Sequence, residues 1–210
     1  MALRLRQPRL IIGSDMINQD GQSGPDTSRQ RRGLADRAAL AAELEATRSA
    51  FHRLLESAAD TVWDEQAIGS AWKVREELWH IAWGMQFMSD LIRNARRRIG
   101  LPRPPMRIAD LINALYARLR GGRATPESIA RRYDRTHAAV QDLLSEMQPD
   151  EWARSVRVFG KTQTVRELFQ GISHHFDEHA RRIYPLLGRE RGQGPQATSG
   201  HPLKGPPTQS

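Results

Sequence analysis

The sequence has no cysteine among its 210 residues. This absence excludes disulfide bonds, thiolate metal sites and a cysteine nucleophile. If the protein binds a metal ion, the ligands must therefore be imidazole, carboxylate or water. Nothing in the cysteine content indicates an oxidising compartment, so we expect a cytoplasmic protein.

The sequence also lacks a long hydrophobic run. No apolar stretch approaches the roughly 20 residues that a helix needs to span a bilayer. Near the N-terminus, only Leu10, Ile11 and Ile12 form an apolar segment after the first arginines, which is too short for a signal peptide. We therefore expect no membrane partner and no export.

Acidic residues are too few to balance the basic ones, and the net charge is +8. Residues 1–35 contribute +3 (six arginines against three aspartates), and residues 189–210 contribute +2 (three basic residues against one glutamate). Residues 36–188 hold 23 basic and 20 acidic residues, or +3. Both ends lack a sustained hydrophobic period, so we expect disordered, solubilising tails around one folded domain at 36–188. The nearly balanced domain argues against a nucleic-acid partner.

Four segments of this domain have the hydrophobic period of an amphipathic helix. Their approximate ranges are 34–62, 73–98, 125–149 and 164–187. The stripe of the first segment consists of Leu40, Leu44, Thr47, Phe51, Leu54, Ala58 and Val62. The third segment begins with a threonine cap followed by proline, and the fourth begins with the capping-box pattern Thr164-x-x-Glu167.

The connection between the second and third helices, about 99–124, is long and carries a short amphipathic helix at about 107–120. A connection of this length can cross the bundle, which lets these two helices run parallel in an up-down-down-up order. Residues 149–163 are expected to form a short extended turn, and no strand pattern is long enough for a sheet. We predict an all-α four-helix bundle.

Two of the seven histidines occupy core positions of the fourth helix. Its stripe runs through Val165, Leu168, Ile172, His175, His179 and Leu186. A buried imidazole without a partner costs roughly 1–3 kcal/mol, so both rings need one. Residues four apart share a helix face, and both can reach one ion at about 2.0–2.1 Å. The spacing favours a metal site at His175 and His179.

His80, in the middle of the second helix, is the candidate third ligand. In an antiparallel pair of helices its depth agrees with that of His175 and His179 to about one turn. Gly84, one turn later, leaves space that a bound water or substrate would require. The alternative is three separately hydrogen-bonded core histidines. A di-iron site is not expected, because Ile172 and Phe176 stand where it would need glutamates.

The other four histidines and Glu76 have different expected roles. We expect His174 at the surface or behind the ligands, and His52 and His201 exposed to solvent. We expect His137 to be a core residue with a hydrogen-bond partner. Glu76 is a candidate base or orienter beside His80, although an acid at a helix start is more often a solvated group favoured by the helix dipole.

Two motifs resemble those of the DinB/YfiT-like superfamily of metal-dependent four-helix-bundle proteins. The first is Trp72-Lys-Val-Arg-Glu-Glu-Leu-Trp-His80-Ile-Ala. The second is Thr164-Val-Arg-Glu-Leu, followed by His175-Phe-Asp-Glu-His179-Ala-Arg-Arg-Ile. The resemblance covers roughly 36–187. Lys73 and Arg182 depart from the usual residues of the family, but neither departure removes a ligand.

The resemblance implies that His80, His175 and His179 bind a divalent metal ion, zinc or nickel in the first place, with iron or manganese as alternatives. Related proteins include mycothiol-dependent maleylpyruvate isomerases and bacillithiol transferases, and such bundles often form dimers. Three imidazoles leave an open coordination position, as in catalytic sites. We expect a metal-dependent enzyme that activates water or a low-molecular-weight thiol, as a thiol S-transferase or hydrolase acting on a small molecule. The alternative is a non-catalytic bundle that is stabilised by metal or binds a ligand.

Overall fold

The apolar stripes predicted from the sequence form the core of the structure, a computed structural model that describes residues 25–97, 99, 106–158 and 160–192. All seven positions of the first stripe are buried. Phe51, at the centre of this stripe, stacks on Tyr133 of the third predicted helix with ring centroids 3.9 Å apart. The core therefore lies where the helical period places it.

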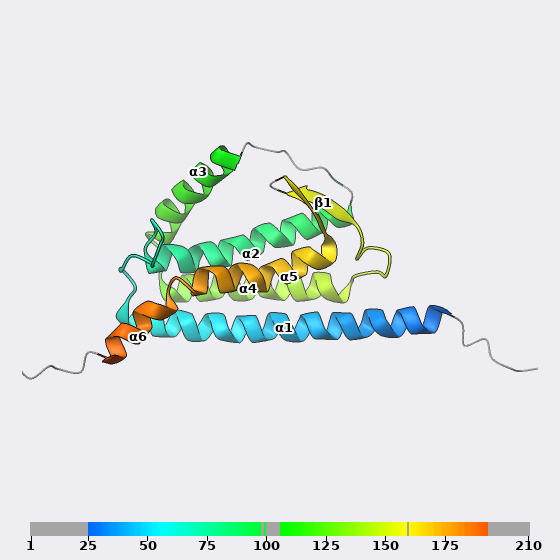
Figure 1. The fold of residues 1–210 in the computed structure, drawn as a ribbon, viewed down its shortest axis with the longest axis horizontal. Coiled ribbons are helices and arrows are strands. Elements are labelled where there is room, and N and C mark those ends of the chain that lie inside the picture. The colour runs from blue at the N-terminus through cyan, green and yellow to red at the C-terminus, as the bar shows by residue number, and fades with distance from the viewer. Residues whose placement is uncertain (1–24, 98, 100–105, 159, 193–210) are drawn as a thin grey trace, which may run out of the picture.

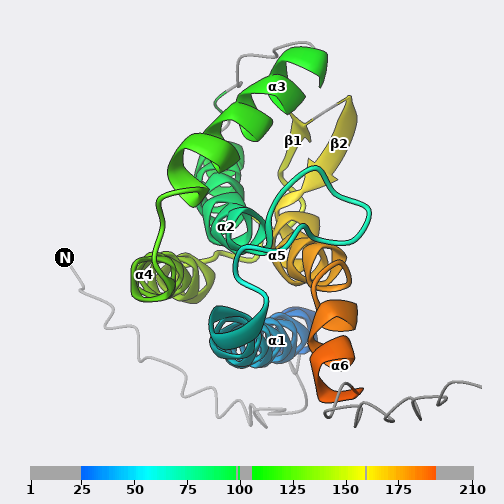
Figure 2. The ribbon, with the colours of Figure 1, turned by 90° about the vertical axis from the view of Figure 1, so that its left-hand side faces the viewer.

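The bundle consists of α1 (Pro25–Thr61), α2 (Val74–Arg96), α4 (Pro126–Ser145) and α5 (Val165–Ala180). α1 and α2 lie diagonally opposite, and each of them packs against both α4 and α5 (Figure 2). α2 and α4 run in one direction, whereas α1 and α5 run in the other (Figure 1). The all-α class and the up-down-down-up order are therefore confirmed.

The connection after α2 carries the expected short helix. This helix, α3 (Met106–Tyr116), continues into a π-helical turn, η1 (Ala117–Gly121). The turn packs tightly on α2, since a Cβ atom at Gly121 would lie 2.9 Å from the Cα atom of Glu76. α3 itself lies outside the four-helix bundle (Figure 2).

Three predicted helix boundaries are wrong. The helix predicted at 125–149 ends at Ser145. α1 begins at Pro25 and not near residue 34, because proline is well suited to the first position of a helix. The expected single helix at 164–187 stops at Ala180, and α6 (Tyr184–Gly192) follows after a turn. Pro185 cannot lie inside a continuous helix, so the break falls just before it. The remainder of the two predicted tails, 1–24 and 193–210, lies outside the described residues.

The predicted extended turn is a β-hairpin. β1 (Ser155–Val158) pairs antiparallel with β2 (Lys161–Thr164), from Ser155 opposite Thr164 to Val158 opposite Lys161. Gly160, in the turn, has a φ of +81°, a conformation that glycine adopts without strain. The expectation that no sheet forms was wrong here, because strands of four residues are too short to give a clear alternating pattern. The second strand leads directly into α5.

Candidate metal centre

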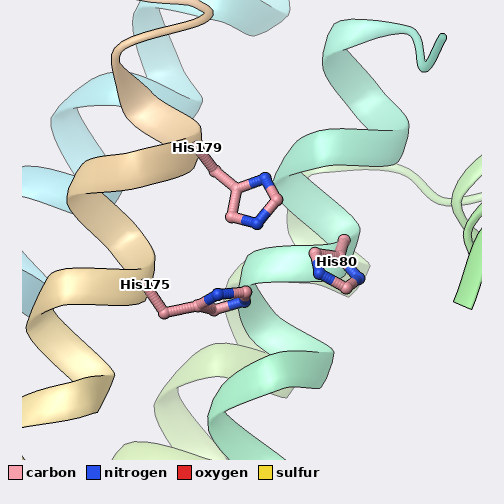
Figure 3. A group of neighbouring side chains, drawn as sticks. All are labelled: His80, His175 and His179. Carbon is pink, nitrogen blue, oxygen red and sulfur yellow. The ribbon is translucent and has the colours of Figure 1, made fainter. Parts of the chain in front are cut away.

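The antiparallel packing of α2 and α5 brings His80, His175 and His179 together. His80 extends from α2, and the other two histidines extend from successive turns of α5 (Figure 3). One possible ligand nitrogen of each residue lies within 4.8 Å of those of the other two. The three ring centroids are 4.5–5.1 Å apart. The three residues could hold one divalent ion.

The starts of both helices are fixed by local hydrogen bonds. At α5, the Thr164 hydroxyl accepts a hydrogen bond from the backbone of Glu167, whose carboxylate accepts one from the Thr164 backbone at 2.7 Å. At α2, a Glu76 carboxylate oxygen accepts the backbone N–H of Lys73 at 3.0 Å. Glu76 is thus a capping residue, and the hypothesis that it orients His80 is not supported by any contact between them.

Glu77 is the acid that contacts the histidine cluster. It is completely buried, and one carboxylate oxygen is hydrogen-bonded to the Nδ1 atom of His179. Arg182 lies 3.5 Å from its other oxygen. Burial alone would raise the pKa of Glu77, but hydrogen bonds from His179 and Ser70 and the charge of Arg182 lower this pKa below its usual value. Because a carboxylate ion only accepts hydrogen bonds, the Nδ1 atom of His179 is the donor in this contact.

The sequence interpretation missed Glu77, although the sequence contained a signal. Glu77 lies three residues before His80 and four before Ile81, so it shares the buried face of α2. A charged side chain on such a face needs a partner. That partner, His179, is separated from it by 102 residues of sequence.

His80 and His175 are held in their neutral form. Burial, with the nearby His175, His179 and Arg182, lowers the pKa of His80 to about 2. Burial followed by the neighbouring His179 lowers the pKa of His175 to about 3. Among the described residues, the Nδ1 atom of His80 and the Nε2 atom of His175 are buried and have no hydrogen-bond partner. Two neutral imidazoles with free buried nitrogens fit the ligand set of a divalent ion.

Gly84 has a different role from the one expected. The space beside it is filled by the His175 ring, and a Cβ atom at residue 84 would lie 2.7 Å from the Cδ2 atom of that ring. The expectation that this glycine leaves room for water or substrate was wrong. Its missing side chain instead lets His175 approach α2 closely enough to face His80.

Two tryptophans cover the cluster. Trp72 lies beside His80, with ring centroids 4.7 Å apart, and is nearly parallel to the His179 ring at 6.3 Å. The ring of Trp83 lies 5.7 Å from that of His80. His80 and His179 are each only 6% exposed. These aromatic rings contribute to the burial that lowers the pKa of His80.

The remaining histidines lie away from the cluster. His174 is exposed, as expected, and His137 is a buried residue whose Nε2 atom lies 3.4 Å from the amide of Gln141. The expectation for His52 was wrong: it is half-buried and hydrogen-bonded to Asp134 on α4 at 2.8 Å. His201 lies outside the described residues.

We expect the metal-free protein to lose stability as the pH falls from about 7 to about 5. The folded-state pKa values of His80 and His175, about 2 and about 3, lie below the ordinary value of 6.5. The unfolded chain therefore binds more protons below pH 6.5, which lowers the free energy of unfolding by up to about 1.4 kcal/mol per pH unit for each histidine. Urea titrations at several pH values measure this slope. His175→Gln should reduce it and His174→Gln should not, whereas three equal slopes would contradict the assignment.

Comparison with known proteins agrees with this architecture. In fold, the chain is similar to crystal structures of the mycothiol-dependent maleylpyruvate isomerase and of a histidine-to-alanine mutant of that enzyme. Each comparison has a TM-score of 0.58, with 17% and 16% sequence identity, respectively. Each covers 70% of this chain and 60% of the other chain, and at this identity the likeness shows the fold alone.

The sequence itself matches a family over most of the folded domain. No curated protein matches the chain. Residues 43–183, however, match the DinB superfamily. This match spans more than half of the chain and includes all three clustered histidines, and the chain belongs to the DinB superfamily.

Proposed function

We propose that His80, His175 and His179 bind one divalent metal ion, zinc or nickel in the first place, and that the protein is a metal-dependent enzyme. The reaction would be thiol transfer or hydrolysis on a small-molecule substrate. The observation that carries the proposal is the convergence of three imidazoles in the core, two of them with buried nitrogens that have no other partner among the described residues. Such nitrogens cost roughly 1–3 kcal/mol each without a partner.

The donor set suits a catalytic ion. Three imidazoles leave at least one coordination position open, and a bound ion would lower the pKa of a water or thiol at that position. Residues around the histidines orient the ligands and shield them from water. Glu77 holds the proton of His179 on Nδ1, while Trp72 and Trp83 exclude water from the rings. Membership of the DinB superfamily and the fold shared with a mycothiol-dependent isomerase support a thiol as the activated group.

A second candidate is a non-catalytic bundle in which the ion only stabilises the fold. The deep burial of His80 and His179 favours it, because structural metal sites are closed to solvent. The cytoplasmic location and the dimer expected from the sequence remain predictions.

We expect the wild-type protein to retain one divalent ion per chain after loading with zinc or nickel and gel filtration. His80→Ala and His175→Ala should each lose it, because each variant removes a ligand, whereas His174→Ala should retain it. Elemental analysis of the four proteins measures the metal content. A wild-type protein without metal after loading would disprove the site.

We expect Glu77→Gln to weaken metal binding about 10- to 100-fold, the effect of losing an outer carboxylate partner of a ligand histidine. Glu76→Gln, one residue away in the helix cap, is the matched control and should bind metal normally. Competition with a chromophoric chelator measures both affinities. ¹⁵N NMR of the metal-free protein should show the proton of His179 on Nδ1. Equal affinities for both variants would contradict the role of Glu77, but they would not contradict the assignment of the three histidines as ligands.

A measurement of turnover distinguishes the enzyme from the non-catalytic bundle. We expect the metal-loaded protein to form a thioether from mycothiol or bacillithiol and an aryl halide, as the thiolate sulfur attacks carbon and the halide leaves. Metal-free protein and His80→Ala should be inactive, and His174→Ala should retain the activity. Release of halide measures the reaction. If metal binds stoichiometrically but neither thiol transfer nor ester hydrolysis is faster than with His80→Ala, the non-catalytic bundle is the correct function.

A further inference from the structure

α3 and η1 expose an apolar surface, of which Tyr116 also packs against Trp79 and Trp83 of α2. The exposed fractions are 67% for Leu111, 50% for Ile112, 55% for Leu115, 40% for Tyr116 and 52% for Leu119. We call these five residues the α3 face. Leu111, Leu115 and Leu119 follow one another at steps of four, as expected for one side of a helix. Single exposed apolar residues are normal on a protein surface, whereas five of them on one helix form a patch that needs an explanation.

The leucines of the α3 face point away from the body of the protein. The connector contacts α2 through Ala117 and Gly121, which are both buried, and through the ring of Tyr116, 5.6 Å from that of Trp79. Leu115 and Leu119 are each two residues from Ala117, a little over half a helical turn, so they lie on the far side of the helix from this contact. Figure 2 shows α3 on the opposite side of α2 from α1.

Arginines surround the end of the α3 face. Arg118, Arg120 and Arg123 are exposed on η1 and the residues after it, and Arg132 and Arg135 lie nearby on α4. Among the described residues, none of these five has an ion-pair partner. Arg132 lies close to Arg135 and Arg120: burial and the charges of these two residues lower the pKa of Arg132, against an opposite effect of Tyr116.

Aromatic rings hold part of this basic group in place. The guanidinium of Arg120 lies 5.8 Å from the centre of the Tyr116 ring, and that of Arg132 lies 5.5 Å from the centre of the Trp79 ring. These contacts fix the arginines beside the apolar stripe without neutralising them. The surface is thus apolar along α3 and positively charged at its end.

We propose that the α3 face and its arginines dock on an anionic phospholipid surface. The leucines would enter the boundary between headgroups and acyl chains, and the guanidinium groups would pair with lipid phosphates. None of the helices that the structure describes is long and apolar enough to cross a bilayer. The proposal revises the expectation from the sequence that the protein has no membrane partner.

Charge favours the lipid over a second copy of the chain. If two copies paired through parallel α3 helices, Arg118 and Arg120 of one copy would face the same residues of the other. Such a pair would bring like charges together across the contact. An anionic surface covers the leucines and also supplies opposite charge to all the arginines.

The test is sedimentation of the full chain with vesicles. We expect binding to vesicles of phosphatidylcholine mixed with phosphatidylglycerol, little binding to phosphatidylcholine alone, and release by high salt. Leu115→Glu should lower the partition coefficient at least about tenfold, because it removes an inserted side chain and adds a negative charge. Arg118→Gln combined with Arg120→Gln should lower it about 30-fold.

The matched control is Leu34→Glu on α1, since Leu34 is 56% exposed, almost the same as Leu115. This variant should bind vesicles like the wild type, and equal thermal unfolding of all variants verifies that they fold. Absence of vesicle binding would overturn the proposal. Binding that Leu115→Glu leaves unchanged would also overturn it and would assign the affinity to another basic region. A dimer that Leu115→Glu dissociates, without vesicle binding, would identify a second copy as the occupant.

Discussion

The packing of α2 against α5 is the constraint on which the candidate site depends. Two contacts set the relative depth of the two antiparallel helices. The His175 ring occupies the space that Gly84 leaves open, and Glu77 is hydrogen-bonded to His179 about two helical turns away along α2. A slip of one turn between the helices would break both contacts together. The meeting of His80 with the two histidines of α5 is therefore a consequence of helix packing, and it requires no flexible loop.

α2 has a different chemistry on each of its sides. One side carries Glu77, His80 and Gly84 toward α5, while another carries Trp79 and Trp83 toward the connector. Trp83 lies between these two regions, with its ring 5.7 Å from His80 and 6.1 Å from Tyr116. Tyr116 also lies 5.6 Å from Trp79, which stacks on Trp83. The position of α3 is thus linked to the wall of the histidine site through the rings of Trp79 and Trp83.

The helical period was sufficient to predict the bundle and to place His175 and His179 on one face, because both depend on residues close in sequence. The order of the helices was predicted from the length of the connection between the second and third helices. His80 was assigned through the resemblance to a family, because the period alone does not tell which helix faces which. Glu77 was missed since its partner is far away in the sequence, and an acid in the first turn of a helix has an ordinary explanation. Gly84 was misinterpreted for a related reason: a missing side chain shows that there is space, but not which group fills it.

The electrostatics of the site bear on the choice between an enzyme and a stabilised bundle. The three histidines would be neutral ligands, so a divalent ion would keep its full charge at the centre of the cluster. The nearest carboxylate, Glu77, is already shared between the imidazole of His179 and the guanidinium of Arg182. The surrounding tryptophans keep the local dielectric constant low, which strengthens the electrostatic attraction between the ion and a bound anion. Such a site would favour an anion at its open position, and thiolate and hydroxide are the two anions that the proposed reactions need.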